Sequence, residues 1–147
     1  MPPIAVAPEL RRAMLEVEVV FGADLESDAP SPAQVRRLCA LAAAVAGIED
    51  GHLAIEYVDA VRIAQLNAEH RGKEGPTDVL SFPIDGATEH DGSPRELGDV
   101  VICPEHTVDL SEAIVHGVLH LVGLDHETDN GEMLALQAEL LADRRSS

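Results

Sequence analysis

The sequence predicts an α+β fold: a single domain in which a mixed four-stranded sheet packs with about four helices. Apolar alternation and short apolar runs mark four strands, and helical spacing with capping residues marks four helices among them. The 147 residues fall within the usual size of one domain, which is enough to bury a core without disulfides. We therefore expect residues 1–147 to form one domain.

The first strand and the first helix are predicted near the N-terminus. Residues 15–21 alternate apolar and polar side chains, the pattern of a half-buried strand. Ser31 is a favoured N-cap residue, and Pro32 suits the first helical position. The helix that they start should run to about Ala46 and end at Gly47.

The second strand and the second helix follow directly. Residues 53–58 are predicted to form a strand, and Asp59 is placed to cap a helix. That helix should end near His70, before Gly72. Its expected apolar face consists of Val61, Ile63, Ala64 and Leu66.

Two further strands are predicted in the centre of the chain. Residues 77–83 are strand-like and close with Pro83, which cannot donate a hydrogen bond to a central ladder. A polar loop over residues 85–96 separates them from residues 97–103, a nearly continuous apolar run. Such a run is typical of a strand that is covered on both faces.

The last third of the chain predicts two helices. Residues 110–122 have helical spacing, with Asp109 or Ser111 as the N-cap and Gly123 as the C-terminal stop. A final helix over about residues 131–145 ends in basic side chains, which suit the negative end of the helix dipole.

Composition limits the classes of function. The formal net charge is −17, whereas a broad nucleic-acid surface needs clustered Lys and Arg, so any RNA would be held locally or through a partner. No apolar run approaches the roughly 20 residues of a membrane span. The N-terminus lacks the pattern of a signal peptide, so we expect a cytoplasmic protein with no membrane partner. Cys39 and Cys103 should be buried, unpaired thiols.

The strongest functional signal is the segment over residues 116–126, HGVLHLVGLDH. His116 and His120 are four residues apart, so on a helix their rings project from one face. Gly123 lets the chain turn, and His126 supplies a third ring nitrogen. Three protein ligands leave the fourth position of a zinc ion open, as in catalytic sites, and nitrogen ligands favour zinc over magnesium or calcium. We predict one zinc ion per chain on these histidines; the alternative is that they are satisfied core residues.

The neighbours of these histidines give weaker signals. Asp125 and Glu127 flank the third predicted ligand, and each either orients a ring N–H or is simply solvated. His106 is a candidate neighbour of the site. The other histidines are expected on the surface: His52, His70 and His90.

The histidine spacing is that of the metzincin proteases, HExxHxxGxxH, with one difference. Position 117 is Gly, where those proteases carry the Glu that serves as general base. Without that carboxylate, an ordinary peptidase mechanism lacks the group that deprotonates water and then protonates the leaving amine. A phosphodiester is less demanding, because a metal or a cation can serve its leaving alkoxide. The missing Glu therefore points away from proteolysis, and a metallopeptidase is the alternative enzyme.

A second informative segment, residues 66–83, carries two cations in a Gly-rich turn. Arg71 and Lys73, the latter the only Lys in the chain, lie between a predicted helix and a predicted strand. The guanidinium fork of Arg matches phosphate oxygens, so both residues are candidates for binding a substrate phosphate. The alternatives are a solvated pair, or an ion pair from Arg71 to Glu74 or Asp78.

These segments resemble a known family. HGVLHLVGLDH is similar to the HGxLHLxGxDH signature of the YbeY endoribonucleases, and LNAEHRGKEGPTDVLSFP is similar to their LNxxxRGKDxPTDVLSFP block. The strand LGDVVIC resembles a third block, LGDIVIC, so the resemblance spans about residues 66–126. The connection over residues 104–115 is shorter than the family pattern leads us to expect, so partners carry over less directly than metal ligands.

The resemblance implies a zincin-like α+β fold and a single-metal endoribonuclease that acts on single-stranded RNA. It implies ribosomal RNA processing, at the 3' end of the small-subunit rRNA, and ribosome quality control, with ribosomal proteins or an assembly GTPase as partners. It also implies that the three motif histidines bind the metal and that Arg71 is the catalytic or substrate-binding cation. The non-enzymatic alternative is a ribosome assembly factor in which zinc only braces the fold.

Overall fold

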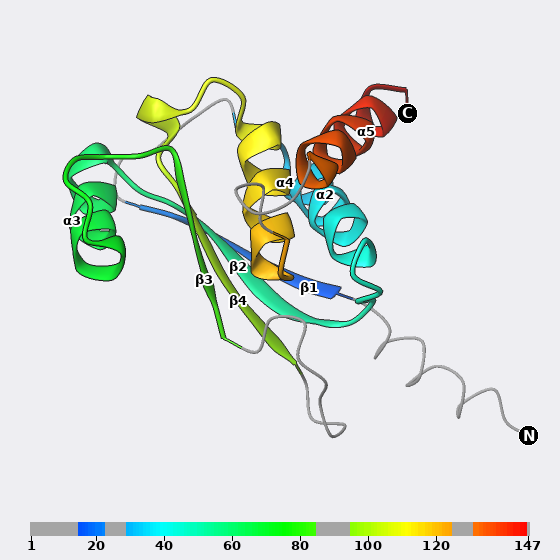
Figure 1. The fold of residues 1–147 in the computed structure, drawn as a ribbon. Helices are drawn as coiled ribbons and strands as arrows, with labels where there is room; N and C mark the ends of the chain where they lie inside the picture. The colour runs from blue at the N-terminus through cyan, green and yellow to red at the C-terminus, as the bar shows by residue number, and fades with distance from the viewer. Residues whose placement is uncertain (1–14, 23–28, 85–94, 125–130, 147) are drawn as a thin grey trace, which may run out of the picture.

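The computed structural model describes residues 15–22, 29–84, 95–124 and 131–146. Within them, a mixed four-stranded sheet packs with four α-helices (Figure 1). β1, β2 and β4 are parallel, and β3 runs antiparallel to β4. The predicted α+β fold with a mixed sheet is therefore confirmed. In spatial order, the strands are β1 (Leu15–Phe21), β2 (Gly51–Tyr57), β4 (Glu96–Ile102) and β3 (Val79–Pro83).

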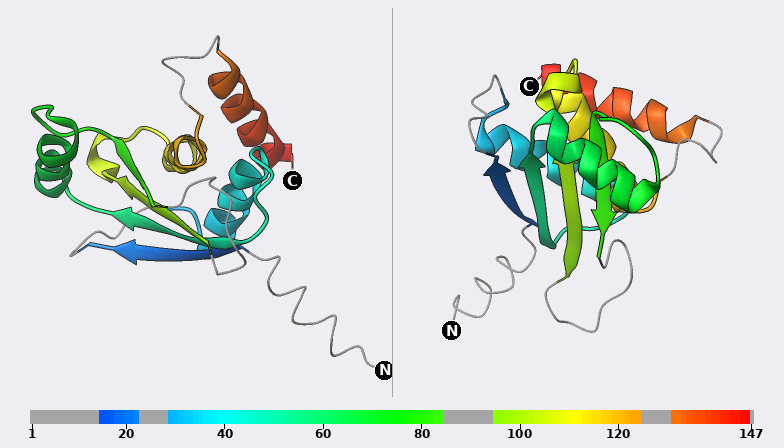
Figure 2. Two further views of the ribbon diagram at one scale, coloured as in Figure 1. Left: turned by 60° about the horizontal axis from the view of Figure 1, so that its bottom comes forward. Right: turned by 90° about the vertical axis from the view of Figure 1, so that its left-hand side faces the viewer.

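The helices lie on both faces of the sheet. In the right-hand view of Figure 2, α3 lies in front of the strands, and α2, α4 and α5 lie behind them. α2 and α4 contact the strands, and α5 packs outside them against both helices. The helices span Pro32–Ala44 (α2), Ala60–Arg71 (α3), Leu110–Leu121 (α4) and Glu132–Ser146 (α5).

Each face of the sheet buries its own apolar cluster. Along β4, Val100 and Ile102 belong to the larger cluster beneath α2 and α4, whereas Val101 belongs to the smaller cluster beneath α3. Cys103, directly after the strand, also joins the smaller cluster. This strand is thus buried on both sides, as its continuous apolar sequence predicted.

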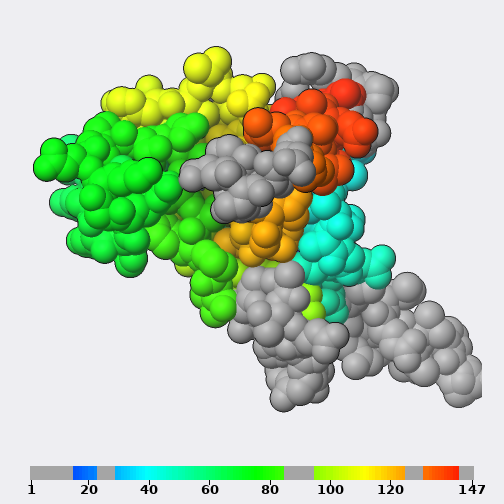
Figure 3. Space-filling view, viewed as in Figure 1, coloured from blue at the N-terminus to red at the C-terminus, as the bar shows by residue number. Residues whose placement is uncertain are grey.

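The predicted caps of three helices are confirmed. In each case the cap oxygen accepts a hydrogen bond from the backbone N–H three residues later; the caps are Ser31, Asp59 and Asp109. Ser111, the alternative to Asp109, lies buried within α4 instead. A short 3-10 helix over Pro104–His106 (η2), which was not predicted, joins β4 to α4. On the face in Figure 3, this connection and the start of α4, in yellow, lie between α3, in green, and α5, in orange to red.

The predicted apolar face of α3 is partly wrong. Ile63 is fully buried, but Val61 is 68% exposed. Two residues apart on a helix lie on nearly opposite sides, so these two side chains could not both face the sheet. The buried side chain that accompanies Ile63 is Asn67, one turn later.

The prediction for the two cysteines agrees with the structure. Cys39 and Cys103 are buried and unpaired. Burial raises the pKa of the Cys39 thiol to about 12, so this thiol stays protonated and unreactive near neutral pH. Over the described residues, every helix is too short or too polar to cross a membrane.

A glycine lets α4 lie directly on the sheet. A Cβ atom at Gly117 would come within 2.4 Å of Cγ1 of Val100 and 3.2 Å of Cγ2 of Val79. The Ser81 hydroxyl on β3 donates a 2.7 Å hydrogen bond to the Gly117 carbonyl oxygen. Glycine within a helix costs about 1 kcal/mol relative to alanine, and the close approach of helix and sheet offsets this cost. Position 117 therefore faces the sheet.

Gly117→Ala should destabilise the protein by about 1–3 kcal/mol, because the stiff β-branched side chain of Val100 would be overpacked. The midpoint of urea unfolding measures the change. On an open helix surface the same substitution would stabilise the protein, so an unchanged or higher midpoint would contradict the close packing. The control is the double variant Gly117→Ala/Val100→Ala, in which removal of the valine methyls should make the two effects non-additive.

Candidate functional site

α4 brings two of the predicted metal ligands together. The ring centroids of His116 and His120 are 4.7 Å apart, and the ring planes meet at 71°. Both side chains are half-buried. Because Gly117 holds one side of the helix against the sheet, these two rings project from another side. The i, i+4 spacing in the sequence therefore produces the side-by-side pair that it predicted.

The third predicted ligand, His126, lies outside the described residues, as do Asp125, Glu127 and His90. α4 ends as predicted just before it: Gly123 has a φ of 107°, and the Leu124 N–H donates a 3.0 Å hydrogen bond to the Leu119 carbonyl oxygen. In the part of the chain that the structure describes, there is no group of three or more His, Cys, Asp or Glu side chains that could hold a metal ion.

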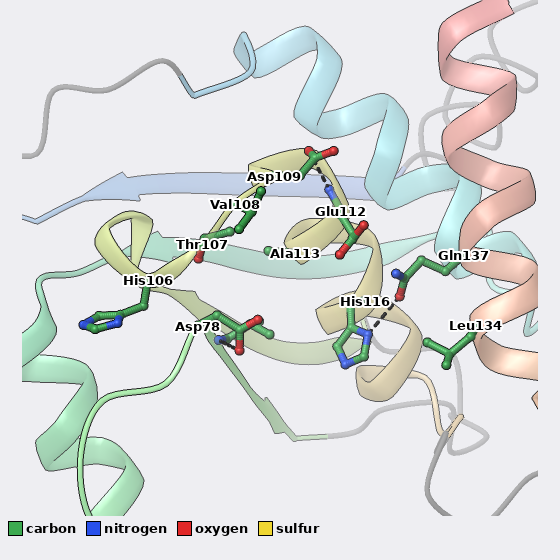
Figure 4. A pocket seen from close by; sticks show the side chains of 11 residues that line it. Asp78, His106, Thr107, Val108, Asp109, Glu112, Ala113, His116, Leu134 and Gln137 are labelled. Atoms are coloured by element: carbon green, nitrogen blue, oxygen red, sulfur yellow. Dashed lines mark hydrogen bonds between the residues drawn. The ribbon is translucent and has the colours of Figure 1, made fainter.

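A residue of α5 holds the ring of His116. Nδ1 of His116 lies 2.8 Å from Oε1 of Gln137 (Figure 4). An amide oxygen only accepts hydrogen bonds, so with Oε1 facing the ring this contact requires a proton on Nδ1. Gln137 is 9% exposed and His116 is half-buried, so the contact lies at the edge of the buried region.

A cavity of about 260 Å³ opens beside His116. Its walls come from the start of β3, from the connection before α4, and from α4 and α5 (Figure 4). Three carboxylates line it: Asp78, Asp109 and Glu112. His106, predicted as a neighbour of the site, also lines the cavity, but its ring points away from His116. The charge of this lining favours a cation and disfavours an uncompensated phosphate.

The two predicted cations lie apart from the cavity. Arg71 is the last residue of α3, and Lys73 follows in the turn; both are exposed. Neither lines the cavity beside His116. Asp78, which does line the cavity, follows this turn along the chain. The turn and one wall of the cavity therefore belong to the same segment. Within the described residues, the alternative ion pair from Arg71 to Glu74 or Asp78 is not formed.

The basic turn has a defined conformation. Gly72 ends α3 in the left-handed region, at a φ of 66°, which favours glycine. The Asn67 side chain on α3 donates a 3.0 Å hydrogen bond from Nδ2 to the Gly75 carbonyl oxygen. Asn67 is only 5% exposed, so this bond ties the turn to the buried side of the helix. Arg71 and Lys73 therefore project from a braced turn.

Comparison with known proteins identifies the family. A family model described as endoribonuclease YbeY matches residues 26–145. The chain belongs to the YbeY family. Proteins described as endoribonuclease YbeY include one from Nocardioides sp., 38% identical over 141 residues, with 81% of this chain and 95% of that protein covered. Another, from Salinispora tropica, is 37% identical over 157 residues, with 90% and 97% covered.

Two further similarities differ in what they cover. The endoribonuclease YbeY of Nitrobacter hamburgensis is 44% identical over 110 residues, but the match covers 63% of this chain and only 58% of that protein. The solution structure of TM1509 from Thermotoga maritima has a TM-score of 0.51 and 22% identity, with 88% of this chain and 92% of that chain covered. At this identity the structural likeness supports the shared fold alone.

Two functional residues of this YbeY-family chain were not predicted from its sequence: Gln137 beside the histidines and Asn67 beneath the basic turn. The same signal could have found both: each is a polar side chain on the buried stripe of a helix. Gln137 lies one turn after Met133 and one turn before Leu141, and Asn67 lies one turn after Ile63; these three neighbours are buried. A buried polar side chain on such a stripe needs a partner, which here is His116 for Gln137 and the Gly75 carbonyl oxygen for Asn67.

Asn67→Ala should destabilise the protein by about 0.5–1.5 kcal/mol, because the hydrogen bond from Asn67 to the Gly75 carbonyl oxygen is lost. Amide hydrogen exchange at Lys73 should also become faster, since the turn loses its tie to α3. Urea unfolding and exchange measured by NMR test the two effects. Gln65→Ala, an exposed change on the same helix, is the control and should stay within about 0.5 kcal/mol of wild type. Exchange as slow as in wild type would show that Asn67 does not hold the turn.

Proposed function

We propose that this YbeY-family protein is a zinc-dependent endoribonuclease that cleaves single-stranded RNA. The observation that carries the proposal is the pair of imidazole rings on α4, of which His116 lines an acidic cavity. The family supports the reaction class, because the relatives named above carry the description endoribonuclease. The proposed role is maturation of the 3' end of the small-subunit rRNA and ribosome quality control.

The residues on α4 fit a zinc ion. His116 and His120 would supply two ring nitrogens from one face of the helix, and His126 would supply the third. Nδ1 of His116 faces Oε1 of Gln137, and a zinc-bound His116 would donate its Nδ1 proton to this oxygen, as zinc-bound histidines commonly do to a neighbouring acceptor. The carboxylates of the cavity add attraction for a cation. When bound with three protein ligands, zinc acts as a Lewis acid and makes a nucleophilic water available near neutral pH.

The basic turn would bind the RNA. Lys73 would contact a backbone phosphate, and the guanidinium of Arg71 would stabilise the charge that develops on the phosphoryl oxygens during attack. The attacking group is either water or the ribose 2'-OH. Since the chain carries a net charge of −17, these local cations would give modest affinity, and ribosomal proteins or an assembly GTPase would bring the rRNA to the site.

The structure gives a physical argument against the metallopeptidase alternative. In the proteases that share this histidine spacing, the residue after the first histidine is the general base. Here that position, Gly117, faces the sheet, where even a Cβ atom would meet Val100. A carboxylate at position 117 could not reach a substrate without moving α4 off the sheet.

His116→Ala and His120→Ala should each abolish stable zinc binding. Removing a direct ligand should weaken zinc binding by more than the roughly 10–100-fold that loss of an outer partner costs. Metal analysis after dialysis gives the occupancy. His70→Ala removes an exposed histidine on α3 and should keep the wild-type zinc content. Full occupancy in both α4 variants would refute the ligand assignment.

Arg71→Ala should retain zinc but cleave single-stranded RNA about 100-fold more slowly or worse, because the developing charge loses its stabilising donor. Arg62→Ala, another exposed arginine of α3, is the matched control and should cleave like wild type. Undiminished cleavage by the Arg71 variant would leave that residue without the proposed role.

Two further measurements, RNA cleavage with a modified substrate and ribosome maturation, distinguish the two possible nucleophiles and the enzyme from the assembly factor. Continued cleavage of a substrate with a 2'-deoxy group at the scissile nucleotide would exclude the 2'-OH as nucleophile. A histidine variant that folds, lacks cleavage and still supports ribosome maturation would favour the assembly factor in which zinc is only structural.

A further inference from the structure

The contact between α4 and α5 assigns a role to a residue beyond the predicted site. We propose that Gln137 is a positioning residue that selects the tautomer of His116 and thereby presents Nε2 of that ring to the metal. This inference rests on the proposed zinc site. It concerns how one ligand is prepared, and it can be tested on the metal-free protein.

Packing fixes the position of Gln137. Met133, one turn before it on α5, is fully buried, and Leu141, one turn after it, is 6% exposed. All three side chains therefore lie on the stripe of α5 that faces α2 and α4. From this stripe, Oε1 of Gln137 reaches Nδ1 of His116 at 2.8 Å. In Figure 4 the two side chains point toward each other across the edge of the cavity.

The chemistry of the acceptor determines what the contact does. An amide oxygen can hold His116 only in the form that carries its proton on Nδ1. A neutral imidazole without such an acceptor prefers the form with the proton on Nε2, and in that form Nε2 cannot bind a metal. Gln137 therefore prepares the ring before any metal arrives, and it does so without adding a negative charge.

The amide has a second possible orientation with the opposite consequence. If the Gln137 NH2 group faced the ring, it would donate to Nδ1 and force the proton onto Nε2. The ring proton thus reports directly on which atom of Gln137 faces His116. If Gln137 served only to pack α5 against α4, the position of the ring proton on His116 would not depend on it.

The first experiment reads the tautomer of His116 in the metal-free full chain by ¹⁵N NMR of the imidazole rings, with the signals assigned from the His116→Ala spectrum. Wild type should carry the proton on Nδ1. Gln137→Met keeps the length of the side chain but removes the acceptor, and it should shift the ring toward the Nε2 form. Gln137→Glu keeps an acceptor oxygen and should retain the Nδ1 form. A wild-type ring protonated on Nε2, or no change in Gln137→Met, would overturn the proposal.

The second experiment measures zinc affinity by competition with a chromophoric chelator. Gln137→Met should bind zinc about 10–100-fold more weakly, and Gln137→Glu should bind within a few-fold of wild type or more tightly. Met133→Leu, a conservative change on the same stripe, is the matched control and should leave both tautomer and affinity unchanged. An equal loss of affinity in Met133→Leu would attribute the effect to packing and overturn the proposal.

The tautomer measurement and the zinc-affinity measurement together separate this inference from the proposed function. Failure of wild type to bind zinc would refute the zinc site, while the tautomer measurement would still decide whether Gln137 orients His116. Wild-type zinc binding together with unchanged tautomer and affinity in Gln137→Met would refute the role of Gln137 and leave the zinc site standing.

Discussion

The close contact between α4 and the sheet at Gly117 is the constraint on which the site depends. With no side chain at this position, the helix lies against Val100 and Val79, and Ser81 bonds to its backbone. A helix held this closely cannot rotate about its axis without clashing, so the directions of all its side chains follow. His116 then emerges at the cavity and within reach of Gln137 on α5, and the ring of His120 lies next to the ring of His116. Gly117, at which this motif differs from the protease motif, is thus needed for the packing of α4 on the sheet.

The distribution of charge divides the proposed reaction between two parts of the molecule. The cavity beside the histidines is lined by carboxylates and suits a cation, whereas the exposed cations Arg71 and Lys73 lie in the turn after α3. The segment that follows this turn enters β3 and contributes Asp78 to the cavity wall. A phosphate held by Arg71 and Lys73 would therefore contact cations that are not part of the acidic lining. This separation explains how a protein with a net charge of −17 could act on RNA without a broad basic surface.

Local chemistry explains which parts of the fold could be predicted from the sequence. The caps at Ser31, Asp59 and Asp109 act within one helical turn, and the alternation in β1 can be recognised within the strand itself. A few neighbouring residues were therefore enough to predict these features. The spatial order of the strands depends on contacts between distant segments, and no local pattern specifies it. The exposed Val61 illustrates the same limit, because α3 buries only the side that meets β3 and β4.

In the site too, contacts within one helix could be predicted from the sequence, and contacts between distant segments could not. The pairing of His116 and His120 follows from their spacing along one helix, whereas the partner of His116 comes from α5 and the brace of the basic turn comes from a buried Asn67. The contribution of His126 stays a prediction, because that residue lies outside the described residues.

X-ray absorption spectroscopy of the zinc-loaded full chain tests the central claim most directly, because multiple scattering from imidazole rings counts the histidine ligands and a longer distance reveals a sulfur ligand. Our account predicts three imidazole nitrogens and one exchangeable oxygen from solvent. A sphere that contains a fourth imidazole or a sulfur atom, or one with fewer than three imidazoles, would contradict it.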